Sequence, residues 1–290
     1  MVTWVNATLA HSRLSGELLD RQVELACLLE VSASKPGNIT PAHDFSDTTY
    51  ADMVRSAVAL GPVFARSRVL RRSVGELIGD GVEATARVAG ANTNLGIVLL
   101  FAPLARAIVT RQAGEELRAG VRRILAQLDV DDAVAAFAAI VRATPGGLGQ
   151  APEHDVRAPA RVTLREAMVA AAHRDSIASE YATDYAIVFE TGLPLLVRAV
   201  CAGKGTLEAI VSLHLGLLAA YPDTLIARKA GDAAAKAVST AAQEVLAGTR
   251  SVADLDAALR ADGNRLNPGT TADLVAGTLL AALLSGVRLP

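Results

Sequence analysis

The loop after the first long helical segment carries residue types that bind phosphate. It begins SKPGN, with Lys35, Pro36, Gly37 and Asn38 in sequence. Pro36 and Gly37 break the preceding helix, and Gly37 can adopt a positive φ that exposes backbone N–H groups. A lysine beside such a turn could meet a phosphate group, so the sequence predicts a phosphate-binding turn here.

The same loop continues with candidates for proton transfer and metal binding. His43, Asp44 and Asp47 offer one imidazole and two carboxylates within five positions. Histidine is a common acid–base group, and carboxylate oxygens are the ligands that magnesium prefers. A solvated loop in which Asp47 caps the following helix explains the segment equally well.

Two further groups of acidic residues could hold a metal ion. Glu76 and Glu83 lie seven positions apart with Asp80 between them, so on a helix all three fall near one side. Glu180 and Asp184 stand at i, i+4 and repel each other unless a cation or a proton lies between them. The alternative for both groups is a charged, solvated helix face. The predicted magnesium ligands are drawn from Asp47, Glu76, Glu83 and Asp184, and the predicted catalytic residues are His43, Asp44, Asp47 and Glu76.

Polar residues also precede strongly apolar helical segments. Asn92, Thr93 and Asn94 come directly before the apolar run LGIVLLFAPLA, and NPGTTADL occupies residues 267–274. The first N–H groups of a helix are unpaired and favour anions, so these positions suit a phosphate or a base edge. Asp223 heads another helix, which carries Arg228 and Lys229. Ordinary helix capping is the alternative at each position. The predicted nucleotide-binding residues are Lys35, Pro36, Gly37, Asn38, Asn92, Thr93, Asn94, Asp223, Lys229, Asn267, Gly269, Thr270 and Thr271.

The elements that position these residues are predicted to be helices throughout. Of the 290 residues, 51% are hydrophobic but only 3% are aromatic, and no segment alternates with period two, which argues against a sheet. We expect one compact all-α domain over residues 1–290, with Thr163–Glu166 as a capping box. Asp131, Thr206 and Thr270 or Thr271 are candidate N-caps. The predicted helices lie near 17–33, 49–65, 73–90, 95–111, 115–128, 131–143, 163–190, 193–203, 206–221, 224–248, 251–261 and 271–286, about twelve in all.

The longest predicted loop spans residues 144–162 and reads TPGGLGQAPEHDVRAPARV. Loops of this length in a compact domain tend to be functional or mobile. Its His154–Asp155 pair could belong to a lid over a binding site. The chain has no G-x-x-x-x-G-K-[ST] or G-x-G-x-x-G motif, so a common phosphate loop is not indicated.

Charge and hydropathy exclude several classes of partner. The net charge is −2 with both signs interspersed, and no basic stripe offers a site for a nucleic-acid backbone. The apolar runs 95–105 and 274–287 are shorter than the ~18–20 residues that span a bilayer. The N-terminus shows no signal-peptide pattern, and Cys27 and Cys201 fit buried free thiols better than a disulfide. We therefore expect a cytoplasmic protein that acts on small molecules without a membrane; a homodimer is left open.

Taken in order, the polar motifs resemble those of the triphosphoribosyl-dephospho-CoA synthase family. The resemblance implies an all-helical enzyme that uses ATP as a donor of the triphosphoribosyl group, with magnesium on the intact triphosphate. The ribose 2′-hydroxyl of dephospho-CoA attacks C1′ of the ATP ribose, and adenine leaves. The matching segments are Lys35-Pro36-Gly37-Asn38, Ser46-Asp47, Asn92-Thr93-x-x-Gly96, Asp223-Thr224-x-Ile226-x-x-Lys229-x-Gly231 and Asn267-Pro268-Gly269-Thr270-Thr271-Ala272-Asp273.

One position departs from the family pattern. Members that act on dephospho-CoA have N-T-H-x-G, whereas this chain has Asn94 in place of the histidine. It is more similar to a divergent branch associated with archaea and with methylotrophs that use methanopterin cofactors. The acceptor therefore stays open between dephospho-CoA and another ribosyl or pterin-type alcohol.

Two alternatives to triphosphoribosyl transfer remain at this point. One is a different nucleotide-dependent step in cofactor biosynthesis, which would release ADP, AMP or pyrophosphate. The other is a helical scaffold without enzymatic activity. An enzyme requires the polar motifs to meet in one cleft, whereas a scaffold would scatter them over the surface.

Overall fold

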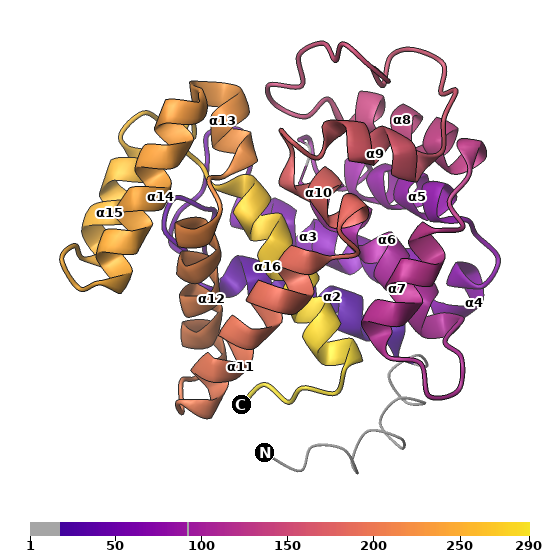
Figure 1. Cartoon of the computed structure of the whole chain (residues 1–290). Helices are drawn as coiled ribbons and strands as arrows, with labels where there is room; N and C mark the ends of the chain where they lie inside the picture. The colour runs from indigo at the N-terminus through magenta and orange to yellow at the C-terminus, as the bar shows by residue number, and fades with distance from the viewer. Residues whose placement is uncertain (1–17, 92) are drawn as a thin grey trace.

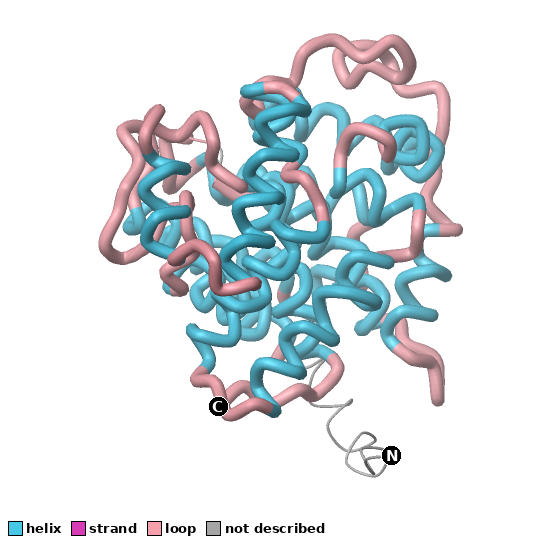
Figure 2. Tube along the Cα trace, turned by 60° about the vertical axis from the view of Figure 1, so that its left-hand side comes forward, coloured by secondary structure: helices cyan, strands magenta, loops and turns pink. Residues whose placement is uncertain are grey.

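The computed structural model describes residues 18–91 and 93–290, and within them every regular element is a helix (Figure 1). The only β-type pairing in this part of the chain is an isolated bridge between Thr40 and His43, and Figure 2 shows helix and loop alone. The prediction of an all-α fold is confirmed. The elements are α2 (Leu19–Ser32), α3 (Tyr50–Leu60), the 3-10 turn η1 (Gly61–Phe64), α4 (Arg66–Val69), α5 (Val74–Ala86), α6 (Leu95–Val109), α7 (Leu117–Leu125), α8 (Val130–Ala143), α9 (Leu164–Ala171), α10 (Ser176–Ala182), the π-helix η2 (Ile187–Gly192), α11 (Leu193–Cys201), α12 (Thr206–Ala220), α13 (Thr224–Ala230), α14 (Asp232–Leu246), α15 (Val252–Arg260) and α16 (Gly269–Leu284).

The helix count exceeds the prediction because two predicted helices are interrupted and because the short helix α4 lies where no helix was predicted. The segment 163–190 is broken at Asp175, which is extended and caps α10, and again at Asp184 and Tyr185, which have φ of 54° and 61°. The segment 224–248 is broken at Gly231, where φ is 92°. Left-handed backbone ends an α-helix, and only glycine adopts it at no cost.

Helices α6 and α16 form the centre of the molecule. Nearly all their residues are buried, and α16, yellow in Figure 1, crosses between the early helices and α11–α12. A Cβ on Gly277 would lie 3.0 Å from Cδ1 of Leu100, so this glycine lets the two helices approach closely. The sequence prediction that these two apolar segments are central is confirmed, because a helix that is apolar all round has no face for water.

Helix α6 contains an internal proline whose cost is offset by a tyrosine. Pro103 has no N–H, so the carbonyl of Leu99 loses its helical donor. The hydroxyl of Tyr181, fully buried in α10, donates to that carbonyl at 2.7 Å. Tyr185 makes a parallel bond of 2.9 Å to the carbonyl of Leu100. These two bonds fix α10 and the segment after it against the middle of α6.

A second, smaller core joins α12 to the last helices. Its buried residues come from α12, α13, α14 and α15, and they include Leu218, Ile226, Val238 and Leu255. This cluster holds α13 beside the start of α16, at the left of Figure 1. The cluster therefore positions the last turn of α13, which contains Arg228 and Lys229, at the edge of the main core.

The helix caps agree with the sequence in part. The capping box is confirmed: the Thr163 N–H donates to Glu166 at 2.8 Å, and the Glu166 N–H donates to the Thr163 hydroxyl at 3.2 Å. The other predicted N-caps were wrong, because the chain enters those helices one to three residues earlier. The observed caps are Asp129 for α8, Gly205 for α12 and Pro268 for α16, in place of Asp131, Thr206 and Thr270 or Thr271.

Cys27 and Cys201 are both free, but only Cys27 is buried, so the expectation of a buried Cys201 was wrong. Between residues 18 and 290, apart from position 92, no single helix is long and apolar enough to cross a membrane. The pair α12 and α13 meets the length and composition only together, across a bend of 57°.

Candidate active site

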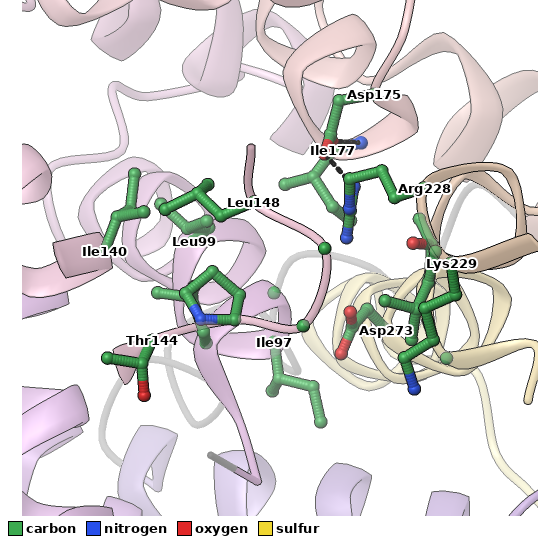
Figure 3. Close-up of a pocket in the computed structure, with 18 of the residues that line it drawn as sticks. Ile97, Leu99, Ile140, Thr144, Leu148, Asp175, Ile177, Arg228, Lys229 and Asp273 are labelled. Carbon is green, nitrogen blue, oxygen red and sulfur yellow. Dashed lines mark hydrogen bonds and ion pairs between the residues drawn. The ribbon is translucent and has the colours of Figure 1, made fainter. Parts of the chain in front are cut away.

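A cavity of about 760 Å³ opens between the α8–α9 loop and the ends of several helices. Its walls come from α2, α3, α6, α8, α9, α10 and α13, the start of α16, and the loops 38–48 and 144–156. A cavity of this volume suits a nucleotide-sized ligand. Figure 3 shows its two contrasting ends.

One end of the cavity is cationic. Arg228 and Lys229 project from the last turn of α13 into it (Figure 3). Arg228 is held by Asp175, whose Oδ2 lies 2.6 Å from Nη1 of the arginine. Burial lowers the pKa of Lys229, and the charges of Asp47 and Asp223 oppose that shift. The charged form of a half-buried ammonium is stabilised when an anion is bound beside it.

A glycine-rich stretch of the α8–α9 loop closes over these cations. A Cβ on Gly146 would lie 3.1 Å from Cε of Lys229, and a Cβ on Gly147 would lie 3.1 Å from Cβ of Arg228. Gly147 also has a φ of 71°. The two glycines therefore allow the backbone to approach α13 more closely than other residues would.

Asp155 holds the far side of this loop. Its two carboxylate oxygens accept the N–H groups of Ala151, at 2.8 Å, and Arg157, at 2.9 Å. These bonds keep the pKa of Asp155 below its usual range. Both His154 and Asp155 line the cavity, as the prediction of a lid segment requires. Whether the loop moves stays a prediction.

The opposite end of the cavity is apolar. Leu99 from α6, Ile140 from α8 and Leu148 from the loop face it, whereas Ile177 of α10 is drawn beside Arg228 (Figure 3). These side chains offer apolar contact and no charge. The cavity thus joins a cationic end to an apolar end within one volume.

Asp223 fixes the cationic end by capping two helices at once. Its Oδ1 accepts the N–H groups of Leu225 and Ile226 at the start of α13, at 2.9 and 3.0 Å. Its Oδ2 accepts both the N–H and the hydroxyl of Thr271 in α16, at 2.7 and 2.8 Å. Burial raises the pKa of Asp223 although the four bonds oppose that shift. The carboxylate therefore ties α13 to α16 behind the cavity wall.

Three comparisons with known proteins agree with one another. The sequence model of the ATP:dephospho-CoA triphosphoribosyl transferase family matches residues 17–289. The chain belongs to this family. A protein of Stutzerimonas stutzeri (strain A1501), provisionally named 2-(5''-triphosphoribosyl)-3'-dephosphocoenzyme-A synthase, is 29% identical over 270 residues, covering 84% of this chain and 83% of its own.

The fold of the family agrees as well. A crystal structure from Archaeoglobus fulgidus, provisionally named triphosphoribosyl-dephospho-CoA synthase, superposes with a TM-score of 0.63 at 25% identity. The match covers 80% of this chain and 99% of that one. The resemblance read from the ordered motifs is therefore confirmed at the level of family and fold.

The transferase motifs that line the cavity come from four separated segments. Asn38 and Asp47 line it from the first loop, Thr93 from just before α6, and Lys229 from α13. The segment before and within α16 adds five more, which are Asn267, Gly269, Thr270, Ala272 and Asp273. The Thr93 hydroxyl donates to Ser56 of α3 at 2.8 Å, which anchors this edge.

Other predicted binding residues lie behind the wall. Lys35 is 1% exposed, its Nζ lies 2.9 Å from Oε1 of Glu30, and it does not line the cavity. The expected contact of Lys35 with a phosphate is therefore wrong for this structure, because the buried carboxylate of Glu30 holds its ammonium group. Of this pair, only Glu30 lines the cavity. Pro36 and Gly37 form the predicted turn, with a φ of 75° at Gly37, but the Gly37 N–H donates to Asp256 at 2.7 Å.

Two predicted binding residues at the starts of α6 and α16 also lie behind the cavity wall. Asn94 is the N-cap of α6 and is 2% exposed, but its side chain makes no capping bond and does not line the cavity. Thr271 is occupied by Asp223. Asn92 lies outside the described residues.

The two predicted proton-transfer residues of the first loop lie outside the cavity wall. His43 pairs through its backbone with Thr40, and Asp44 accepts the N–H of Tyr50 at 2.6 Å. Both side chains are exposed. The first loop therefore contributes Asp47 but neither His43 nor Asp44.

The predicted carboxylate cluster does not form. Glu76 closes a capping box with Ser73, Glu83 pairs with Arg87, and the carboxylate of Asp184 is shared between Arg122 and Arg165. None of the three lines the cavity, so their assignment as magnesium ligands, and that of Glu76 as catalytic, is corrected. Each of these carboxylates is paired with a nearby arginine instead of a metal ion. Within the described chain no group of three His, Cys, Asp or Glu residues could hold a metal.

Several residues of the cavity were absent from the predicted site. They share no spacing in sequence, and tertiary packing alone brings them together: Glu30, Arg174, Asp175, Arg228 and Asp273. Arg228 and Asp273 each lie inside a motif that was singled out, which was the available signal. Glu30, Arg174 and Asp175 carried none.

Proposed function

We propose that this cavity binds ATP and an acceptor alcohol together and transfers the triphosphoribosyl group from ATP to the 2′-hydroxyl of dephospho-CoA, with release of adenine. The observation that carries the proposal is the union of a cationic end and an apolar end in one cavity of about 760 Å³. Membership of the ATP:dephospho-CoA triphosphoribosyl transferase family supports the reaction type.

The triphosphate occupies the cationic end. Lys229 and Arg228 supply positive charge, and Arg174 lines the same cavity. The glycines at 146 and 147 bring backbone close to these side chains. No bond within the triphosphate breaks in this reaction, so the protein has to neutralise and orient it rather than cleave it.

The adenosine moiety extends toward the apolar end. Leu99, Ile140 and Leu148 provide the uncharged apolar contact that suits a purine ring. This arrangement places the C1′–N9 bond between the two ends. An acceptor hydroxyl that enters there meets the carboxylates of the cavity, which can stabilise the positive charge that develops on the ribosyl carbon.

Magnesium is the expected companion of the triphosphate. Asp47 fits a ligand role, because it lines the cavity, is exposed, and accepts only the Thr48 hydroxyl, at 3.3 Å, among the described residues. Magnesium commonly uses one or two carboxylates, phosphate oxygens and water, so a cluster of three is not required. When bound, the ion would neutralise part of the triphosphate charge. Asp47→Asn should raise the magnesium concentration needed for half-maximal ATP binding.

The test is to identify the products. Purified protein is incubated with ATP, magnesium and dephospho-CoA, and the mixture is analysed by mass spectrometry. We expect free adenine and a product that retains three added phosphates. A parallel incubation with a pterin-type alcohol addresses the substitution at Asn94. Release of ADP, AMP or pyrophosphate in place of adenine would refute the proposal.

A further inference from the structure

Asp273 differs from the buried carboxylates that surround it at the cationic end of the cavity. Asp175 is paired with Arg228, Asp223 accepts four hydrogen bonds, and Glu30 is paired with Lys35. Asp273 lines the cavity, yet no side chain or backbone group of the described residues bonds its carboxylate. In Figure 3 its oxygens point into the space between Ile97 and Lys229.

The position of this carboxylate is fixed by a glycine of α6. A Cβ on Gly96 would lie 2.1 Å from Oδ2 of Asp273. The carboxylate, carried by the second turn of α16, therefore rests directly against the backbone of α6, where a larger residue at 96 would displace it. Two motifs that are far apart in sequence meet at this one contact.

The surroundings also make this group a strong base. Burial raises the pKa of Asp273 well above its usual range, and the charges of Glu30 on α2, Asp223 at the start of α13 and Asp175 at the start of α10 add to that shift. Arg228 on α13 opposes it. A carboxylate that holds a proton more tightly accepts one more readily during a reaction near neutral pH.

We propose that Asp273 is the general base of the reaction, the group that accepts the proton of the attacking hydroxyl. The bond from the hydroxyl oxygen to C1′ of the ATP ribose forms as the proton passes to an oxygen of Asp273. The C1′–N9 bond breaks, and its electron pair leaves with adenine, which takes a proton from water; Asp273 then returns its proton to the solvent. The role rests on the proposed transfer and assigns one step of it.

The test compares three variants of the full-length protein. Asp273→Asn keeps the shape but cannot accept the proton, Gly96→Ala keeps the carboxylate but displaces it, and Asp273→Glu restores a base with a longer side chain. Asp262→Asn makes the same chemical change at an exposed carboxylate outside the cavity and serves as the control. Adenine release, ATP affinity by calorimetry and circular dichroism are measured for each.

We expect Asp273→Asn to lower kcat by about 100-fold or more, the usual contribution of a general base, while ATP affinity and the fold are kept. Gly96→Ala should lower kcat, and Asp273→Glu should recover part of it. In the wild type, kcat/KM should fall as the pH drops below the raised pKa of Asp273, and this limb should vanish from the residual activity of Asp273→Asn.

Two results would overturn this role while leaving the transfer intact. One is a kcat of Asp273→Asn equal to that of the control. The other is a loss that lies wholly in ATP or magnesium affinity, which would make Asp273 a binding residue. If the wild type releases no adenine with any acceptor, the proposed transfer itself fails, and the role of Asp273 fails with it.

Discussion

Replacing Tyr181 by Phe should destabilise the protein through one carbonyl of α6. Pro103 leaves the Leu99 carbonyl without a helical donor, and the Tyr181 hydroxyl is the group that satisfies it, at 2.7 Å. Both partners are buried, so water cannot replace the hydroxyl. An unsatisfied buried acceptor costs about 1–3 kcal/mol, and for a chain of this size each kcal/mol lowers Tm by roughly 2–4 °C.

Urea denaturation followed by circular dichroism measures this cost, and the chain offers a matched control. Tyr185→Phe removes the same hydroxyl from a bond of 2.9 Å to Leu100, whose i+4 residue in α6 is Leu104, which has an N–H, rather than a proline. This control should cost less, because Leu100 keeps its helical partner.

A double-mutant cycle with Pro103→Ala decides whether the reasoning holds. Alanine at 103 restores the N–H that Leu99 lacks, so Tyr181→Phe should then cost much less than it does in the wild-type background. Equal costs in the two backgrounds would show that the hydroxyl does not compensate for the proline, and the argument would be refuted.

Three further changes test the site and its supports. Lys229→Met should weaken ATP binding roughly tenfold or more in calorimetry, the value of one charge-assisted bond, whereas Lys236→Met on the exposed face of α14 should not. Asp223→Asn should lower the free energy of unfolding by about 1–3 kcal/mol in urea, because Oδ2 becomes a donor facing Thr271; an unchanged midpoint would contradict its double-capping role. Glu180 is buried, which raises its pKa to about 7 although two backbone N–H groups oppose the shift. Its folded form therefore binds a proton more tightly than its unfolded form, so wild-type stability should fall by roughly 3 kcal/mol as pH rises from about 4.5 to 7, and Glu180→Gln should flatten this slope.

Residue order and local pattern were sufficient for the fold class and the family. Helical periodicity, a core poor in aromatic residues and the absence of alternation predicted an all-α chain, and short polar motifs in a fixed order indicated the transferase family. The apolar character of α6 and α16 placed them at the centre, because such segments leave no face for water. These properties depend on the types of residue and their spacing, which the sequence contains in full.

Which polar residue faces the cavity was decided only by tertiary contacts. Lys35, in a motif typical of phosphate binding, is held by Glu30, and Glu76 and Glu83 are held by local arginines or a capping box. Asp273 was only the last residue of a matching motif, yet it lies in the cavity against Gly96, which leaves room for its carboxylate. The energy of a charged side chain is set by the groups within a few ångströms of it, and those groups come from segments that only folding brings together.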